Sequence, residues 1–369
     1  MASKLELRWR EDDFSFTDAL YFHNADARAV SRELDGDRLP VPARRDDLTF
    51  EIARDQFLSR RSSFVRVEPV VGRWYPSRLL DNHPCVTTGF RVVGDHGETL
   101  RIDANHPLAG RVVEALVSDT EVAAALDGFR EALPRSKLSA WLSSGVGLQA
   151  SRADFLAGDA LTRVDAAVDS QFYAMPRLVQ HIDSHCRATI TDLYGALIAP
   201  GGDVLDLMSS WVSHLPGDLE LGCVRGLGMN RDELAANPRL DDFVVHDLNR
   251  LPRLPFDDAS FDAIVCTVSV EYLTQPRAIF SEAARVLRRG GQFVNTFSER
   301  CFPTKAIKVW GEIDPYERVA LVAEHYRSTG LFDQCQAWAL SGLPRPPDDP
   351  YHEMSLMADP VYAVWGVKT

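Results

Sequence analysis

The chain has 369 residues, of which 45% are hydrophobic and 25% are charged, so it is long enough for two globular domains. Its formal net charge of −13 disfavours a nucleic-acid partner, because an acidic protein repels the phosphate backbone. The first residues lack the apolar run of a signal peptide, and no stretch approaches the roughly 20 apolar residues of a membrane span, so we predict a cytoplasmic protein without a membrane partner.

The first third of the chain predicts a mixed structure in which β-strands dominate. Residues 64–71 alternate between apolar and polar, and residues 89–93 and 99–103 flank the turn signal Gly94-Asp95-His96-Gly97, which predicts a β-hairpin. A helix is expected over residues 119–133 from its apolar face. The composition changes over residues 134–170, which is typical of a domain junction. We therefore predict a domain over 1–134, a linker over 135–170 and a second domain over 171–369.

The second domain alternates between helices and strands. Helices are expected over residues 177–197, 231–236, 275–287 and 315–329, and strands over residues 203–207, 219–226, 242–246, 261–266, 291–297, 335–340 and 361–367. This alternation predicts an α/β fold with a doubly wound, seven-stranded, mostly parallel sheet and helices on both faces. The first strand ends at Asp206 and small residues follow at once, which is the layout of a nucleotide-cofactor loop.

The cysteines and histidines give little indication of a metal. The six cysteines are scattered and form no CxxC pair, which favours reduced thiols over a disulfide framework or a zinc site. His181 and His185 have the i, i+4 spacing that can hold a metal on the helix expected there. Two histidines alone are a weak signal, and a solvent-facing helix accounts for them. We predict no metal site.

Four collinear segments of the second domain resemble class I S-adenosylmethionine-dependent methyltransferases of the small-molecule type, with a Rossmann-like fold. The segments are Val204-Leu205-Asp206-Leu207, then 224–230 (VRGLGMN), then 245–262 (VHDLNRLPRLPFDDASFD), and finally 283–293 (AARVLRRGGQF). The last two carry the most specific motifs of the family. The resemblance implies a transferase that uses S-adenosylmethionine as its cofactor.

The resemblance also implies where the cofactor would lie, and it shows two departures from the family pattern. Asp206 supplies the carboxylate that ends the first strand, and Ser209 and Ser210 are small enough to approach the ligand. Met208 and Trp211 stand where the family usually has small residues. The second departure concerns the acid that binds the ribose hydroxyls, because its place falls at Gly228.

The remaining cofactor contacts follow the same resemblance. Asn230 is expected to take one ribose hydroxyl, while the backbone of Gly228-Met229 packs against the ribose. Asp247 fits the position that reads the adenine amino group, and the amide of Leu248 would read a ring nitrogen. Capping of the next helix by Asp206, and capping of a turn by Asp247, are the structural alternatives.

Methyl transfer needs alignment, a dry site and sometimes a base. Ser269 opens the segment that approaches the methyl group in the family, and Glu271 and Tyr272 follow it. Glu271 is a candidate base, with a helix N-terminal carboxylate as the alternative, and Tyr272 and His214 are the other candidates. In the segment before the first strand, the resemblance implies that Tyr173 covers the cofactor and that Arg177 pairs with its carboxylate. The list of candidate catalytic residues is thus Glu271, Tyr272 and His214.

The first domain resembles SlyD-type FKBP prolyl isomerases over roughly residues 45–118. The motif is Asp103-Ala104-Asn105-His106-Pro107-Leu108-Ala109-Gly110, and residues 46–57 are similar to the inserted flap of those proteins. The segment that usually opens the domain in that family has no recognisable counterpart in this sequence. The resemblance implies a smaller FKBP-like α+β domain, in which His106 and Leu108 match pocket-lining positions.

Two functions follow from these patterns. The first is an S-adenosylmethionine-dependent methyltransferase that acts on a small molecule or a peptide, with an FKBP-like accessory domain. The alternative is a non-catalytic binding protein that keeps the methyltransferase fold and carries a peptide-binding or prolyl-isomerase-like N-terminal module. The sequence leaves open whether the chain forms a homodimer.

Overall fold

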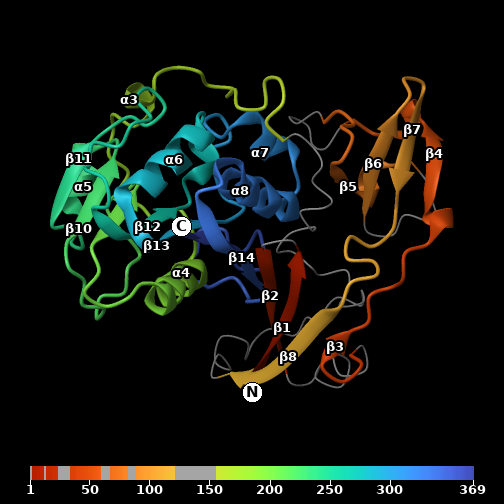
Figure 1. The fold of residues 1–369 in the computed structure, drawn as a ribbon, viewed down its shortest axis with the longest axis horizontal. Coiled ribbons are helices and arrows are strands. Elements are labelled where there is room, and N and C mark those ends of the chain that lie inside the picture. Colours follow the sequence, from red (N-terminus) through yellow and green to blue (C-terminus); the bar gives the residue numbers. More distant parts are fainter. Residues whose placement is uncertain (1, 12–13, 24–33, 60–66, 82–88, 121–154) are drawn as a thin grey trace.

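A computed structural model describes residues 2–11, 14–23, 34–59, 67–81, 89–120 and 155–369, and every structural statement below concerns these residues. Their strands form a large sheet and a small one (Figure 1). The large sheet has the order β11-β10-β9-β12-β13-β15-β14-β2-β1-β8-β3. Its C-terminal strands are β9 (Val204–Leu207), β10 (Val224–Gly228), β11 (Asp242–Val245), β12 (Phe261–Thr267), β13 (Leu287–Phe297), β14 (Phe332–Ser341) and β15 (Val361–Lys368).

Strands from the N-terminal part extend this sheet beyond β14. They are β1 (Ala2–Glu11), β2 (Phe14–His23), β3 (Arg38–Leu39) and β8 (Val113–Thr120). β2 pairs with β14 in parallel, with Phe16 opposite Ala337. The described sheet therefore has eleven strands and not the seven expected from the sequence. The physical reason is that the outer side of β14 would otherwise leave a row of backbone groups without partners.

The seven C-terminal strands form one continuous part of the sheet. β11, β10, β9, β12 and β13 run parallel, and β15 is antiparallel to both of its neighbours. The strands on both sides of residue 134, where we expected a domain boundary, thus share one sheet. Residues 121–154, which hold most of the expected linker and the expected helix over 119–133, lie outside the described residues.

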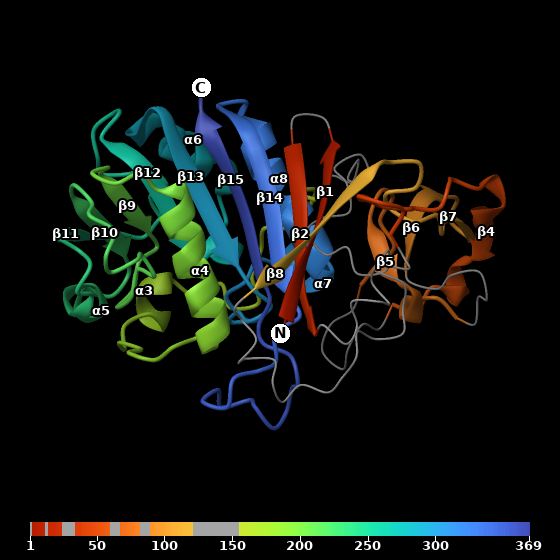
Figure 2. The same ribbon diagram turned by 90° about the horizontal axis from the view of Figure 1, so that it is seen from below.

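Helices cover both faces of the large sheet, as the alternating pattern predicted. They are α3 (Asp169–Phe172), α4 (Ser184–Leu197), α5 (Arg231–Ala236), α6 (Pro276–Val286), α7 (Lys308–Glu312) and α8 (Pro315–Thr329). α4 lies on the opposite side of the sheet from α6 and α8 (Figure 2). Neighbouring strand residues divide accordingly, so Leu205 and Ile264 pack in the core that includes α6 and α8, while Val204 and Val265 pack in the core that includes α4.

The ends of these helices follow from local sequence. Asp183 caps α4, because its carboxylate accepts a hydrogen bond from the backbone N–H of Cys186 at 2.8 Å. Asn230 caps α5 by accepting from the amides of Asp232 and Glu233. α4 begins at Ser184, so the helix expected over 177–197 is shorter than predicted, and residues 173–183 run as an irregular segment.

The small sheet is antiparallel, with the order β4-β7-β6-β5. Its strands are β4 (Thr49–Ala53), β5 (Trp74–Pro76), β6 (Gly89–Asp95) and β7 (Thr99–Asp103). β6 and β7 pair as the expected hairpin, which confirms that prediction. Residues 67–71 are not a strand, and the remainder of the expected strand over 64–71 lies outside the described residues.

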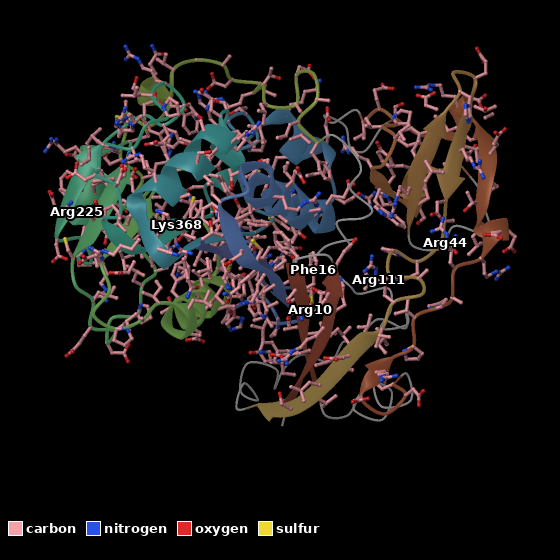
Figure 3. All side chains as sticks on the ribbon, viewed as in Figure 1. Arg10, Phe16, Arg44, Arg111, Arg225 and Lys368 are labelled. Atoms are coloured by element: carbon pink, nitrogen blue, oxygen red, sulfur yellow. The ribbon has the colours of Figure 1, made fainter. Side chains whose placement is uncertain are left out.

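A buried contact ties the small sheet to α8, and a second contact ties the segment after β7 to β1 of the large sheet. The backbone N–H of Trp74 donates to the Glu317 carboxylate of α8 at 2.8 Å. Arg111 bonds to β1, through the carbonyl of Arg10 at 3.2 Å and the carboxylate of Glu11 at 3.2 Å (Figure 3). Both contacts join segments that are distant in sequence.

The described cysteines are all free thiols: Cys186, Cys223, Cys266, Cys301 and Cys335. Cys85 lies outside the described residues. None of the helices in the described ranges combines the length and the apolar character needed to cross a bilayer.

Candidate functional site

A pocket opens at the carboxyl ends of β9, β10, β11 and β12, and its cavity has a volume of about 140 Å³. Parallel strands converge there, which is where open α/β sheets bind their ligands. The residues expected from the sequence that line it are Tyr173, Arg177, Asp206, Met208, Ser209, Ser210, His214, Gly228, Met229, Asp247, Leu248, Ser269 and Tyr272. Two expected residues, Asn230 and Glu271, are outside this lining.

The loop after β9 keeps the backbone conformation that glycine favours. Met208 has φ = 60°, in the left-handed region. A methionine thus holds a left-handed backbone conformation at this position of the loop. Two other pocket residues, His214 (φ = 56°) and Val268 (φ = 42°), share this unusual conformation. Strain of this kind persists only where surrounding structure imposes it, and it concentrates at functional sites.

Asp206 is 2% exposed and lies at the base of this loop. Its carboxyl accepts a hydrogen bond from the Ser209 hydroxyl at 2.6 Å. Burial raises the pKa of Asp206 to about 7, although hydrogen bonds from Ser209 and Ser213 oppose the shift. A protonated Asp206 is therefore substantially populated near neutral pH. The alternative that Asp206 caps the next helix is wrong, since no helix begins in this loop.

The same loop crosses the end of β10. The backbone N–H of Ser209 donates to the carbonyl of Leu227 at 2.8 Å. As a result, a Cβ placed on Gly228 would stand 2.1 Å from the carbonyl oxygen of Ser209. Because real Cβ atoms do not approach a backbone oxygen so closely, no acidic side chain can occupy position 228 with this loop in place. The path of the loop after β9 therefore determines that position 228 is glycine.

The side chain of Asn230, which we expected to take a ribose hydroxyl, has other hydrogen-bond partners. Its carbonyl oxygen caps α5, and its amide nitrogen donates to the carbonyls of Tyr173 at 2.9 Å and Ala174 at 3.2 Å. Glu233, in the first turn of α5, was not expected from the sequence, although it lines the pocket and is 8% exposed. Its place three residues after a helix-capping Asn230 is the sequence signal that could have drawn attention to it.

Glu233 holds two walls of the pocket together. One carboxylate oxygen accepts from the backbone N–H of Arg177 at 2.7 Å, and the other accepts from the hydroxyl of Ser210 at 2.7 Å. The irregular segment 173–183 is thereby fixed against the loop after β9. Trp211 adds to this wall, because its indole N–H donates to the carbonyl of Val179 at 3.2 Å.

Arg177 lies among aromatic rings at the pocket. Its guanidinium carbon is 4.5 Å from the ring centroid of Phe172 and 5.5 Å from that of Phe302. One nitrogen, Nη2, donates to the carbonyl of Phe172 at 2.8 Å, whereas the buried Nη1 has no hydrogen-bond partner in the described residues. Tyr173, also at 5.7 Å from this guanidinium, shields the same side of the pocket. Phe302 had no sequence signal.

His181 and His185 do not share a helical face, because α4 begins between them. His181 lines the pocket, where its ring packs edge-on against Phe302 at a centroid distance of 5.2 Å, and burial lowers its pKa. His185 lies in α4 and its Nδ1 is 2.9 Å from the carbonyl oxygen of Pro344. The spacing that suggested a metal pair therefore does not bring the two rings together.

Asp247 follows β11 and serves a turn. Its Oδ1 accepts from the backbone amides of Asn249 at 3.0 Å and Arg250 at 3.1 Å, as the structural alternative proposed. Its Oδ2 has no partner among the described hydrogen bonds and remains available on the pocket wall. Leu248, beside it, is buried in the pocket lining.

The predicted base Glu271 is fully buried and does not reach the pocket. Neither carboxylate oxygen has a hydrogen-bond partner in the described residues, and burial raises its pKa to about 7. In this position its carboxylate has no contact with the pocket, and the placement does not support its expected role as a base. The segment from Val270 to Tyr272 forms a 3-10 helix (η6), and this turns Glu271 inward and Tyr272 toward the pocket.

The other two candidates for proton transfer do line the pocket. The Tyr272 hydroxyl accepts from the backbone N–H of Phe302 at 2.9 Å, and burial raises its pKa well above the usual value. His214 is half-buried, and desolvation lowers its pKa to about 4, so its imidazole is neutral at physiological pH. Ser269 donates its hydroxyl to the carbonyl of Thr267 at 2.9 Å.

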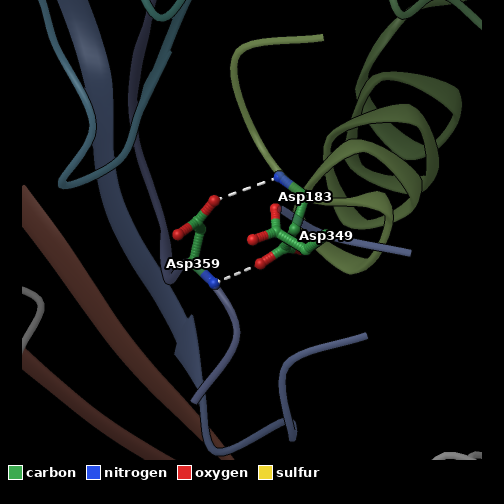
Figure 4. A group of neighbouring side chains, drawn as sticks. All are labelled: Asp183, Asp349 and Asp359. Atoms are coloured by element: carbon green, nitrogen blue, oxygen red, sulfur yellow. Dashed lines mark hydrogen bonds between the residues drawn. The ribbon is translucent and has the colours of Figure 1, made fainter. Parts of the chain in front are cut away.

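A buried group of three carboxylates, Asp183, Asp349 and Asp359, lies beyond the pocket at the start of α4 (Figure 4). Asp183 and Asp359 exchange hydrogen bonds, each accepting from the other's backbone N–H. Arg345 and Arg300 neutralise the group, at 3.0 Å from Asp359 and 2.7 Å from Asp349. The arrangement anchors the end of segment 173–183 with internal partners.

In the N-terminal part, Leu108 is 1% exposed and belongs to the large core, so it does not line a pocket. The Nδ1 of His106 accepts from the backbone N–H of Leu108 at 3.1 Å. The turn that carries this motif thus contributes Leu108 to the core of the large sheet.

No curated protein matches this chain. Among solved structures, it is similar to a chain of the complex between the Haloferax volcanii Trm112 methyltransferase activator and its methyltransferase, with 18% identity over 50% of this chain and 90% of that one, at a TM-score of 0.35. The Bacillus subtilis YcgJ protein has 15% identity over 49% and 97%, at a TM-score of 0.36. A Thermotoga maritima S-adenosylmethionine-dependent methyltransferase has 14% identity over 50% and 89%, at a TM-score of 0.37.

One family model also matches the chain. Residues 223–295 match the model described as a methyltransferase domain. This range begins just before β10 and ends within β13, so it includes three of the four strand ends that meet at the pocket. The match places a methyltransferase domain in the C-terminal half of the chain and supports S-adenosylmethionine as its cofactor.

Proposed function

We propose that this protein is an S-adenosylmethionine-dependent methyltransferase that acts on a small molecule or a peptide. The observation that carries the proposal is the meeting of four strand ends at one pocket, because those ends bear Asp206, Gly228, Asp247 and Ser269, the positions the resemblance assigns to the cofactor. Fold alone does not fix a function, whereas the chemistry of these four residues bears on it directly.

The residues present fit the cofactor at both of its ends. The unpartnered Nη1 of Arg177 is a buried donor that a carboxylate would satisfy. At the other end, the free Oδ2 of Asp247 can accept from an amino group, and the backbone of Leu248 lies beside it. Ser210 and Met208 form the floor between them.

When bound, the cofactor supplies an electrophilic methyl group. The protein's part is to align the acceptor and exclude water. Burial raises the pKa of Asp206 and lowers those of His181 and His214, so it disfavours the charged forms of these three side chains. The neutral imidazole of His214 has a nitrogen that can accept a proton from an O–H or N–H group of the methyl acceptor. The Tyr272 hydroxyl can orient that group.

Calorimetric titration of the full chain with S-adenosylmethionine and with S-adenosylhomocysteine tests the proposal. We expect binding, and we expect Asp247→Ala to weaken it about 10-fold or more, since one charge-assisted hydrogen bond is worth about 1.5–3 kcal/mol. Asp206→Ala should weaken it as well. No binding at millimolar ligand overturns the proposal, and unchanged affinity in both variants overturns the assigned contacts.

A second candidate function is binding without methyl transfer. The burial of Glu271 favours it, because the carboxylate expected as base has no access to the pocket. The measurement that distinguishes the two candidates is the formation of S-adenosylhomocysteine from S-adenosylmethionine when the protein is incubated with cell extract. Binding without any such turnover would favour this candidate.

We infer that the N-terminal part, which resembles FKBP-type proteins, has an accessory role in this protein. The buried contact between Trp74 and Glu317 supports a module fixed on α8, and the burial of Leu108 disfavours an open isomerase pocket there. A proline-peptide isomerisation assay on the full chain tests it, and measurable catalysis would contradict a purely accessory role.

A further inference from the structure

The described cofactor contacts leave two carboxylates of the pocket lining unused, Asp169 and Glu233, and Asp169 is paired with Arg163 and Lys305. Glu233 is 8% exposed, and no described lysine or arginine side chain forms an ion pair with it. Its two hydrogen-bond partners, the backbone N–H of Arg177 and the hydroxyl of Ser210, are both neutral donors. A buried carboxylate without a cation is costly unless its oxygens are well hydrogen-bonded.

Glu233 still has room for two donors. A carboxylate offers about four acceptor sites, and the two bonds at 2.7 Å occupy one on each oxygen. Two adjacent hydroxyl groups are the ligand feature that matches one free site on each oxygen. The ribose of a nucleoside carries such a pair.

The residues that would otherwise meet a ribose are excluded. Position 228 cannot carry an acid, because the carbonyl oxygen of Ser209 lies 2.1 Å from a Cβ there. The side chain of Asn230 is committed to the cap of α5 and to the carbonyls of Tyr173 and Ala174. Glu233 arises from the next turn of the chain and reaches the same wall of the pocket.

We propose that Glu233 binds the two ribose hydroxyls of the cofactor, in place of an acid at position 228. This inference rests on the proposed function. The loop after β9 covers the end of β10, and the acid that binds the ribose would therefore lie about one helical turn later in the chain, at Glu233. Ser210 and the amide of Arg177 act as positioning groups that orient the Glu233 carboxylate.

The test compares S-adenosylhomocysteine with its 2′-deoxy and 3′-deoxy analogues in calorimetric titrations. In the wild-type protein we expect each missing hydroxyl to weaken binding about 10-fold or more. In Glu233→Gln, which keeps the shape of the side chain, the parent ligand should bind more weakly and the deoxy penalty should fall to about 3-fold or less. Asp232→Asn, which removes the exposed neighbouring carboxylate, is the matched control and should keep the full penalty.

The outcomes separate the two proposals. If wild-type protein binds neither cofactor form, the proposed function fails and this inference fails with it. If wild-type protein binds with a deoxy penalty that Glu233→Gln leaves intact, or if the variant weakens all ligands equally, Glu233 is a structural clamp and only the inference is overturned. Thermal denaturation checks that each variant is folded. Should Glu233→Gln unfold, Glu233→Asp serves instead, because its shortened carboxylate keeps the charge and should reduce the deoxy penalty.

Discussion

The carbonyl oxygen of Ser209 lies 2.1 Å from the point where a Cβ would stand on Gly228. These two residues belong to neighbouring strand ends, and the contact makes the sequence of one depend on the path of the other. A glycine at the end of β10 is therefore required by the backbone of the loop after β9.

Gly228→Ala should lower the free energy of unfolding by about 1–3 kcal/mol, the usual cost of overpacking. The added methyl group meets a backbone atom that cannot move without displacing the Ser209–Leu227 hydrogen bond. Gly217→Ala is the control, since no heavy atom lies within 4 Å of its Cβ position. Urea unfolding of both variants measures the difference. Equal stabilities would show that the loop gives way freely.

The raised pKa of Asp206 predicts a pH-dependent stability. The folded state keeps this proton up to about pH 7, whereas an unfolded aspartate loses it near pH 3.9. The folded state thus binds more protons between these values, so the free energy of unfolding falls as pH rises from about 4 through 7. Asp206→Asn removes this contribution, and its stability relative to wild type should increase between pH 5 and pH 8. A difference that does not change with pH would contradict the raised pKa.

Arg177 should increase the affinity only for ligands that carry a carboxylate. Arg177→Met keeps much of the packing between Phe172 and Phe302 but removes the unpartnered Nη1. We expect about 10-fold or more weaker binding of S-adenosylhomocysteine, and little change for 5′-methylthioadenosine, which lacks the carboxylate. Arg277→Met, at an exposed position of α6, is the control. Equal weakening of both ligands would assign Arg177 a structural role only.

The cluster of three carboxylates at the start of α4, Asp183, Asp349 and Asp359, should stabilise the fold without a bound metal. Arg345→Met leaves Asp183 and Asp359 buried with less compensation, so the free energy of unfolding should fall by about 3–5 kcal/mol. Arg327→Met, which removes a half-exposed pair with Glu324, should cost far less. Addition of EDTA to the wild-type protein should leave Tm unchanged. A lower Tm with EDTA would indicate that the group holds a cation.

Much of the C-terminal half could be predicted because its local signals are strong. α5 begins and ends where expected, at Arg231 and Ala236, since Asn230 is a favourable cap. The strand ends that line the pocket follow from buried apolar runs such as Val204–Leu207. These features depend on residues that are close in sequence, so the chain itself specifies them.

The errors concern features decided by distant contacts. Glu271 was expected at the pocket, but the 3-10 turn of η6 directs its side chain inward. Glu233 was missed because its importance depends on the path of the loop near Ser209, which sequence spacing does not reveal. The extension of the sheet by β2 was missed for the same reason, since nothing near residue 16 indicates a partner near residue 337.

The pairing of β2 with β14 has a consequence for how the protein is made. A ribosome releases β2 long before β14, whose residues lie more than three hundred positions later. The outer edge of the sheet can therefore close only when synthesis is nearly complete, and until then β1 and β2 are a strand pair with an open edge. Folding in the cell should depend on keeping this strand pair from pairing with other chains, and a C-terminal truncation before β14 should aggregate and not fold.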